Sequence, residues 1–170
     1  MKKSSGAMVA IISVVLLTVI CCSKPYTVEH AATVETARDS RFVAYDNGTV
    51  LDTRTKLMWS AKDNGSDINW VNAKFYCENY RGGGYKDWRM PTLNELEGLY
   101  DASKSRPAAC YGSNSIHVVT ELIDITCFCP WASETSDSEA AIFDFGPGIR
   151  SGFASQLTRF SRALPVRSGK

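Results

Sequence analysis

The stretch that most constrains how this chain folds is residues 82–100, GGGYKDWRMPTLNELEGLY. The Thr92 hydroxyl can accept a hydrogen bond from the Glu95 N–H, and the Glu95 carboxylate can accept one from the Thr92 N–H, which is the pattern of a capping box. Pro91 stops an upstream helix from running into this one. Apolar side chains then recur at helical spacing, at Leu93, Leu96, Leu99 and Tyr100. The pattern predicts a short capped helix that lies on a core.

Length and charge limit the class of protein. A chain of 170 residues with 44% hydrophobic composition suits one globular domain with a substantial core. The formal net charge of +1 comes from 19 basic and 18 acidic residues. Because nucleic-acid binding normally needs an excess of basic residues, we expect no nucleic-acid partner.

The N-terminus has the pattern of an export signal. Two lysines precede an apolar run over residues 7–22, which is short for a spanning helix of roughly 20 residues. Cys21 and Cys22 close the run and are candidates for lipidation, although the residue before them is not the usual Gly or Ala. Residues 1–22 are therefore interpreted as a signal peptide, a lipoprotein signal or a retained anchor. Residues 23–40 are polar and aperiodic and are interpreted as a tether, so the folded domain is expected over 41–170.

Export changes how the remaining cysteines are interpreted. In an oxidising compartment, four cysteines predict two disulfides among Cys77, Cys110, Cys127 and Cys129. A direct bridge between Cys127 and Cys129 is the most strained pairing, so we expect each to reach a more distant partner. The alternative is a zinc site built from Cys110, His117, Cys127 and Cys129, which are ligand types that zinc prefers, at a spacing that matches no common motif.

Local patterns predict a mixture of strands and helices. Turn chemistry at residues 46–48 lies between strands expected at 42–45 and 49–51, and a further strand is expected at 56–59. Trp70, Ala73, Cys77 and Tyr80 form one helical stripe that Asp67 or Asn69 can cap. Later strands are expected at 131–133, 141–145 and 164–167, with a turn at 146–148, while 117–125 fits either strand or helix.

These residues resemble a known family of exported bacterial domains, first described at the C-terminus of a Legionella collagen-like protein and also catalogued as DUF1566. The resemblance covers roughly residues 41–168. Its motifs are Asp46-Asn47-Gly48-Thr49-Val50, Asp52-Thr53-Arg54-Thr55, Leu57-Met58-Trp59, Tyr76-Cys77-Glu78-Asn79, residues 84–92 with Glu95-Leu96, Trp131-Ala132-Ser133 and Pro165-Val166-Arg167.

The family is similar to C-type lectin-like domains, so the resemblance implies an α+β fold. Two helices would pack on small antiparallel sheets, with the N- and C-terminal strands brought together. The calcium-dependent sugar motifs of lectins, Glu-Pro-Asn and Trp-Asn-Asp, are absent. Formylglycine-generating enzymes carry a comparable Arg-Leu-Pro-Thr-x-x-Glu turn, but their C-terminal cysteine pair has no match here. Family members often carry a cysteine where Ala163 and Leu164 stand, which leaves the partner of Cys77 open.

The segment Asp87-Trp88-Arg89 admits two interpretations. An acid, an aromatic ring and a guanidinium could clamp a polar ligand. We favour an internal ion pair that fixes the loop before the capped helix, which gives Asp87, Trp88, Arg89, Thr92 and Glu95 structural roles. On that interpretation, Arg89→Ala lowers the melting temperature by several degrees.

The segment after Trp131 is the predicted contact surface. It is rich in acidic and hydroxyl side chains, which also favour calcium, although no Asp-x-Asp-x-Asp-Gly loop is present. A solvated loop is the simpler interpretation of the same composition. The predicted ligand-binding residues are Trp131, Ser133, Glu134, Thr135, Asp137, Glu139 and Asp144.

Catalytic motifs are scarce in the sequence. His30 lies in the expected tether, and His117 lacks a flanking catalytic motif. We therefore expect a non-enzymatic binding or adhesion module, tethered at the cell envelope, that recognises a glycan or protein through its loops and holds no cofactor. The alternatives are a cell-surface enzyme distantly related to the formylglycine-generating group, which free thiols would favour, and a structural subunit of an envelope complex.

Overall fold

The computed structural model describes residues 33–169, and these residues form an α+β arrangement of two α-helices, one 3-10 turn and three sheets. The elements in chain order are β1 (Glu35–Asp39), β2 (Phe42–Tyr45), β3 (Thr49–Asp52), β4 (Leu57–Ser60), α1 (Trp70–Asn79), η1 (Gly82–Gly84), α2 (Leu93–Glu97), β5 (Arg106–Ala108), β6 (Tyr111–Ile116), β7 (Cys129–Ser136), β8 (Glu139–Asp144), β9 (Ile149–Ala154), β10 (Ser161–Arg162) and β11 (Val166–Ser168).

The N-terminal meander confirms the predicted strands and turn. β2 pairs antiparallel with β3, and β3 with β4, in the five-stranded order β1-β2-β3-β4-β11. Gly48 has a φ of 76°, which suits the glycine in this turn. β11 pairs antiparallel with β4, with Val166 opposite Trp59. The end of the chain therefore lies beside its N-terminal strands, as the resemblance implied.

β1 changes the expected start of the folded part. It lies inside the segment 23–40 that was interpreted as a tether, and it pairs antiparallel with β2. The Asp46 N–H donates to the Val34 carbonyl, and the Val34 N–H donates to the Asp46 carboxylate. The strand escapes a search for apolar alternation because most of its side chains are exposed. The predicted signal or anchor at 1–22, with Cys21 and Cys22, lies outside the described residues.

α1 begins as expected and is fixed to β7 by two indoles. Asn69 is the N-cap and accepts a hydrogen bond from the Asn72 N–H. Trp70 donates its indole N–H to the Ala132 carbonyl at 2.8 Å, and Trp131 donates its own to the Ile68 carbonyl at 2.7 Å. Of the predicted stripe, Ala73 and Cys77 are buried, whereas Trp70 and Tyr80 are only half-buried.

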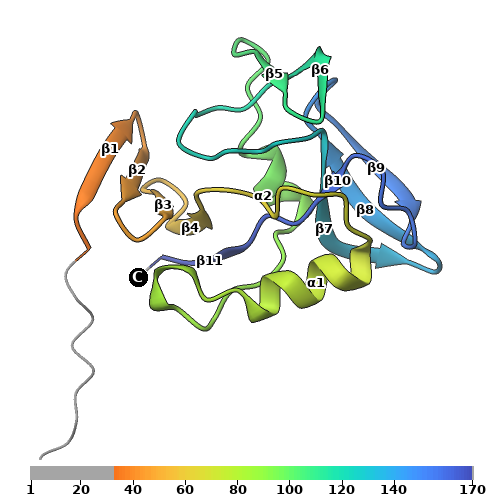
Figure 1. Cartoon of the computed structure of the whole chain (residues 1–170), viewed down its shortest axis with the longest axis horizontal. Helices are drawn as coiled ribbons and strands as arrows, with labels where there is room; N and C mark the ends of the chain where they lie inside the picture. Colours follow the sequence, from red (N-terminus) through yellow and green to blue (C-terminus); the bar gives the residue numbers. More distant parts are fainter. Residues whose placement is uncertain (1–32, 170) are drawn as a thin grey trace, which may run out of the picture.

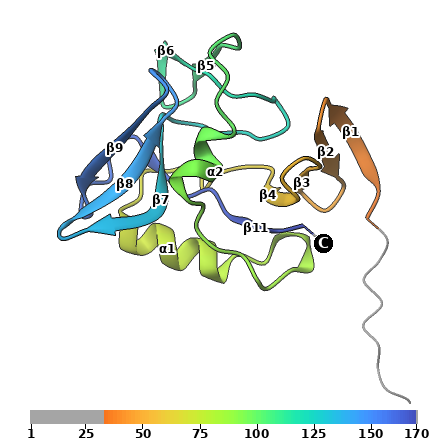
Figure 2. The same cartoon turned by 180° about the vertical axis from the view of Figure 1, so that it is seen from behind.

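α2 occupies the centre of the molecule. Figures 1 and 2 show it between the β1–β4 meander on one side and β7–β9 on the other. Its Leu96 is fully buried in a core cluster with Trp59, Phe143 and Leu164. A second cluster under α1 contains Cys77, Met90, Cys129 and Trp131. The predicted helix is confirmed, and its buried Leu96 packs against residues of the five-stranded and the four-stranded sheet.

The remaining strands were partly missed. β7, β8 and the turn at 146–148 agree with prediction, but β9, β10 and the β5–β6 hairpin carry no strong periodic pattern. β10 pairs parallel with β7, and β8 pairs antiparallel with both β7 and β9. Residues 117–126 form turns with isolated bridges, so neither the strand nor the helix considered for that segment is present.

Candidate functional site

Residues 82–100, here called the joint, hold their charged groups in internal pairs. Asp87 accepts two hydrogen bonds from the Arg167 guanidinium, at 2.7 and 3.0 Å. The Arg167 side chain is only 7% exposed, and its guanidinium carbon lies 3.9 Å from the centre of the Tyr85 ring. Trp88 is buried and donates its indole N–H to the Gly82 carbonyl. This half of the joint fixes the C-terminal strand β11 to the loop.

The second half of the joint is the capping box. Glu95 accepts from the Thr92 N–H at 2.8 Å, and the Thr92 hydroxyl accepts from the Glu95 N–H. The Arg89 guanidinium donates to both oxygens of the same Glu95 carboxylate, at 2.8 and 2.6 Å. Burial by itself would raise the pKa of Glu95, but hydrogen bonds from Arg89 and Thr92 outweigh it and hold the pKa below its ordinary value. These contacts support the structural interpretation of Asp87, Trp88, Arg89, Thr92 and Glu95.

The predicted contact segment is divided among different roles. Trp131 is fully buried, so its side chain is part of the core. The Ser133 N–H donates to the Pro91 carbonyl. The Glu134 carboxylate accepts from the Leu93 N–H at 3.0 and 3.1 Å, which satisfies a free donor in the first turn of α2. Ser133 and Glu134 therefore hold β7 to the start of α2, whereas Trp131 belongs to the core under α1.

The rest of that segment is spread along a hairpin. Thr135 and Glu139 lie on β7 and β8 beside a shallow groove, and Asp137 is in the turn between them with a φ of 50°. Asp144 lies at the far end of β8. Nowhere in residues 33–169 do three His, Cys, Asp or Glu side chains converge to hold a metal ion, so the structure offers no support for calcium here.

The cysteines give one disulfide and two free thiols. Cys110 is bonded to Cys127, which confirms a distant partner for Cys127 and rules out the zinc site, since two of its ligands are consumed. His117 instead contacts the Lys104 carbonyl through Nδ1. Cys77 and Cys129 are free and buried, so the prediction of a second disulfide is wrong. Burial raises the pKa of each thiol to about 12, which leaves little thiolate at neutral pH.

A cleft of about 640 Å³, here called the aromatic cleft, has a mixed apolar and polar lining. It is formed where β6, the start of β7, the β8–β9 turn and the segment before β10 meet. Four rings line it, from Tyr111, Phe128, Phe153 and Phe160. Its polar side chains include Asn114, Ser115, Asp144 and Arg159. Of the predicted contact residues, only Asp144 lies here.

Phe160 contacts two of the other three rings and the Arg159 guanidinium. Phe128 and Tyr111 meet it edge to face, with ring centres 5.9 and 6.1 Å away. The Arg159 guanidinium carbon lies 4.6 Å from the same ring centre. Phe160 has a φ of 64°, which is strained for a bulky residue and is tolerated where surrounding contacts enforce it. Strain of this kind concentrates at functional sites.

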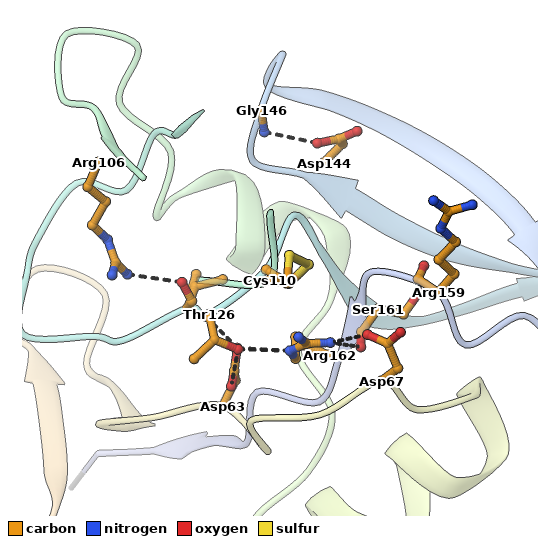
Figure 3. The surroundings of a disulfide bond; sticks show 12 residues. Asp63, Asp67, Arg106, Cys110, Thr126, Asp144, Gly146, Arg159, Ser161 and Arg162 are labelled. Atoms are coloured by element: carbon orange, nitrogen blue, oxygen red, sulfur yellow. Dashed lines mark hydrogen bonds and ion pairs between the residues drawn. A yellow bond between two sulfur atoms is a disulfide. The ribbon is translucent and has the colours of Figure 1, made fainter. Parts of the chain in front are cut away.

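Near the cleft, a charge network around the buried side chains of Arg162 and Asp63 holds the disulfide-bearing segment. Arg162 donates to the Asp67 carboxylate at 2.5 Å and to the Thr126 hydroxyl at 2.8 Å. Asp63 accepts from the Thr126 N–H and hydroxyl, and burial raises the pKa of Asp63 against these hydrogen bonds. Figure 3 shows this network below the disulfide, the Asp144–Gly146 contact above it, and Arg159 at the right, above Ser161. The network therefore fixes the segment that follows Phe160 to the segment that carries the disulfide.

Sequence reasoning missed most of the cleft because its rings come from separate segments without a shared motif. The available signal was aromatic density around Phe153 and Arg159-Phe160, in a stretch of low regular periodicity.

Within the described residues, no helix is both long and apolar enough to cross a bilayer.

Comparison with known proteins gives one family. The model of the family described as the Lcl C-terminal domain matches residues 48–167, which include the joint and every residue that lines the aromatic cleft. No curated protein matches the chain.

Proposed function

The chain belongs to the Lcl C-terminal domain family, and from that membership we propose that it is an exported, non-enzymatic binding module that recognises a glycan or protein partner in the aromatic cleft. The single observation that carries the proposal is the cleft itself. It combines apolar rings with a few polar groups in a volume of about 640 Å³, within the range of about 300–1,000 Å³ usual for small-ligand sites.

The contact surface proposed here differs from the one that the sequence favoured. The hairpin of β7 and β8 has a shallow groove beside Glu134, Thr135 and Glu139. Glu134 is already engaged by the first turn of α2. The aromatic cleft, by contrast, has two charged side chains, Asp144 and Arg159, that form no ion pair within residues 33–169.

Two finer features belong to the same proposal. We infer a C-type lectin-like fold, supported by two helices packed against antiparallel sheets and by β11 beside β4. We also infer envelope tethering through residues 1–22, by lipidation of Cys21 or Cys22 or by a retained anchor. Lipid labelling of the wild type beside a double Cys→Ser variant tests the lipid; absence of label on the wild type would rule it out.

The experiment for binding uses the full-length chain, probed against arrays of glycans and of extracellular proteins. Tyr111→Ala removes a ring of the cleft, and Phe75→Ala removes a comparably exposed ring from α1 as a matched control. We expect wild type and Phe75→Ala to bind the same partner and Tyr111→Ala to lose it. Binding that survives Tyr111→Ala unchanged would move the site away from the cleft.

An enzyme related to the formylglycine-generating group is the second candidate, because Cys129 is a free thiol that lines the cleft. The pKa of about 12 argues against a thiolate nucleophile at this position. Oxidation of thiol-containing peptides by the wild type, lost in Cys129→Ser, would support the enzyme. No turnover is expected.

A further inference from the structure

We propose that the aromatic cleft binds uncharged pyranose rings of a glycan, in preference to sulfated or otherwise anionic chains. This inference rests on the proposed function and names the ligand class of the same cleft. A pyranose has apolar C–H faces and a rim of hydroxyl groups, so it needs a site with aromatic surface and planar polar side chains side by side.

The apolar part of the match comes from the rings. Tyr111 is 53% exposed, so much of its ring surface is available to a ligand. Phe128, Phe153 and Phe160 are half-buried and form the inner lining. Edge-to-face packing of Tyr111 and Phe128 against Phe160 holds these rings in place before a ligand arrives. A preorganised apolar surface reduces the entropy lost on binding.

The polar part of the match comes from three side chains with free hydrogen-bonding capacity. One oxygen of Asp144 accepts from the Gly146 N–H at 2.9 Å, which orients the carboxylate and leaves its other oxygen as an acceptor. Asn114 accepts from the Ser113 hydroxyl through its side-chain oxygen, which leaves its amide as a donor. Arg159 adds further donors in a fixed planar group. Sugar hydroxyls both donate and accept, so they satisfy all three.

The charge balance of the cleft favours an uncharged ligand. Its acidic and basic lining side chains are one carboxylate, Asp144, and one guanidinium, Arg159. Within residues 33–169 neither side chain forms an ion pair. An anionic chain would gain from Arg159 but would be repelled by Asp144. The net charge of the whole chain is only +1, so no long-range field favours a polyanion either.

The test is calorimetric titration of the full-length chain with neutral disaccharides and, separately, with heparin, each at low and high salt. We expect neutral disaccharides to bind with an affinity that salt barely changes, since no ion pair is formed. Asp144→Asn retains an acceptor for the Gly146 N–H but removes the charge and one acceptor. It and Tyr111→Ala should each weaken binding by on the order of tenfold. Val71→Ala on α1 serves as the matched control for an exposed apolar residue.

The outcomes separate this inference from the proposed function. Binding of heparin alone, or binding that disappears at high salt, would overturn the neutral-sugar inference and leave a binding module in place. Capture of a protein partner that depends on Tyr111, without sugar binding, would also overturn the neutral-sugar inference and leave the binding module in place. If no glycan or protein binds, both proposals fail. Thermal unfolding of each variant confirms that a lost titration signal is not a lost fold.

Discussion

The joint and the aromatic cleft contain the same kinds of side chain and use them in different ways. In the joint, Asp87 is paired with Arg167, and Arg89 is paired with Glu95. In the cleft, Asp144 and Arg159 form no ion pair within the described part of the chain. An acid, a guanidinium and aromatic rings therefore do not identify a site by themselves. A structural cluster differs from a contact surface in that its charged groups already have ion-pair partners inside the protein.

The largest expected effect comes from breaking the joint at Asp87. Asp87→Ala leaves the buried Arg167 guanidinium without the two hydrogen bonds from this carboxylate. Because Asp87 is itself half exposed, we expect the free energy of unfolding to fall by about 2 kcal/mol, below the 3–5 kcal/mol of a fully buried pair. Denaturant unfolding measures this, with the exposed neighbour Lys86→Ala as control. Equal stability of the two variants would show that the pair is dispensable.

Arg89→Ala should have a smaller effect on the same region. It removes two hydrogen bonds to Glu95 but leaves the capping box, so we expect a loss of about 1 kcal/mol and a melting temperature lower by a few degrees. A wild-type melting temperature in Arg89→Ala would return Arg89 to the list of ligand-binding residues.

The pH dependence of stability provides a second test of the joint. The pKa of Glu95 is lower in the folded protein than its ordinary value of 4.5. Its charge therefore contributes stability above the unfolded pKa, and this contribution is lost as the pH falls through the lowered folded pKa. The difference in unfolding free energy between wild type and Glu95→Gln should shrink in acid. A difference that is constant from neutral to strongly acidic pH would contradict the assignment.

The reactivity of the two free thiols gives another comparison of the joint with the cleft. Cys77 is fully buried beneath the joint, whereas Cys129 is 5% exposed and lines the cleft. Both should react slowly with iodoacetamide at neutral pH, because each pKa is about 12. Mass spectrometry of the labelled native protein should find Cys129 modified severalfold faster than Cys77. Faster labelling of Cys77 would mean that the joint opens more readily than the cleft admits reagent.

The smallest expected change in stability is in the cleft. Asp144→Asn keeps a side-chain oxygen for the Gly146 N–H, so the free energy of unfolding should change by less than about 0.5 kcal/mol. Calorimetric unfolding checks this. A large loss would mean that Asp144 is a structural residue, like Asp87.

What could be predicted from the sequence was local. The capping box of Thr92 and Glu95, the turn at Gly48 and the cap at Asn69 each depend on residues a few positions apart, and each is present. The hydrogen bonds between residues far apart in the sequence could not be predicted from it. Arg167 meets Asp87 across 80 positions, and Arg162 meets Asp67 across 95.

The cleft belongs to the second class of features. Asp144 and the segment that ends at Phe160 are brought together because β8 and β10 both pair with β7. Tyr111 comes from the separate β5–β6 hairpin and meets Phe160 edge to face. Glu134 shows the converse error, since its acidic neighbours suggested a contact loop while its carboxylate caps α2. In both places the composition showed which kinds of side chain were present. Only the tertiary structure showed which of them already have partners inside the protein.

The central claim is tested most directly by two matched arginines, one from each region, measured in the same two assays. We predict that Arg159→Gln keeps the wild-type unfolding free energy and loses affinity for the glycan or protein partner found on the arrays. We predict that Arg89→Ala loses stability and keeps that affinity, measured below its melting temperature. The opposite pattern, with binding lost in Arg89→Ala and kept in Arg159→Gln, would contradict the account and place the contact surface at the joint.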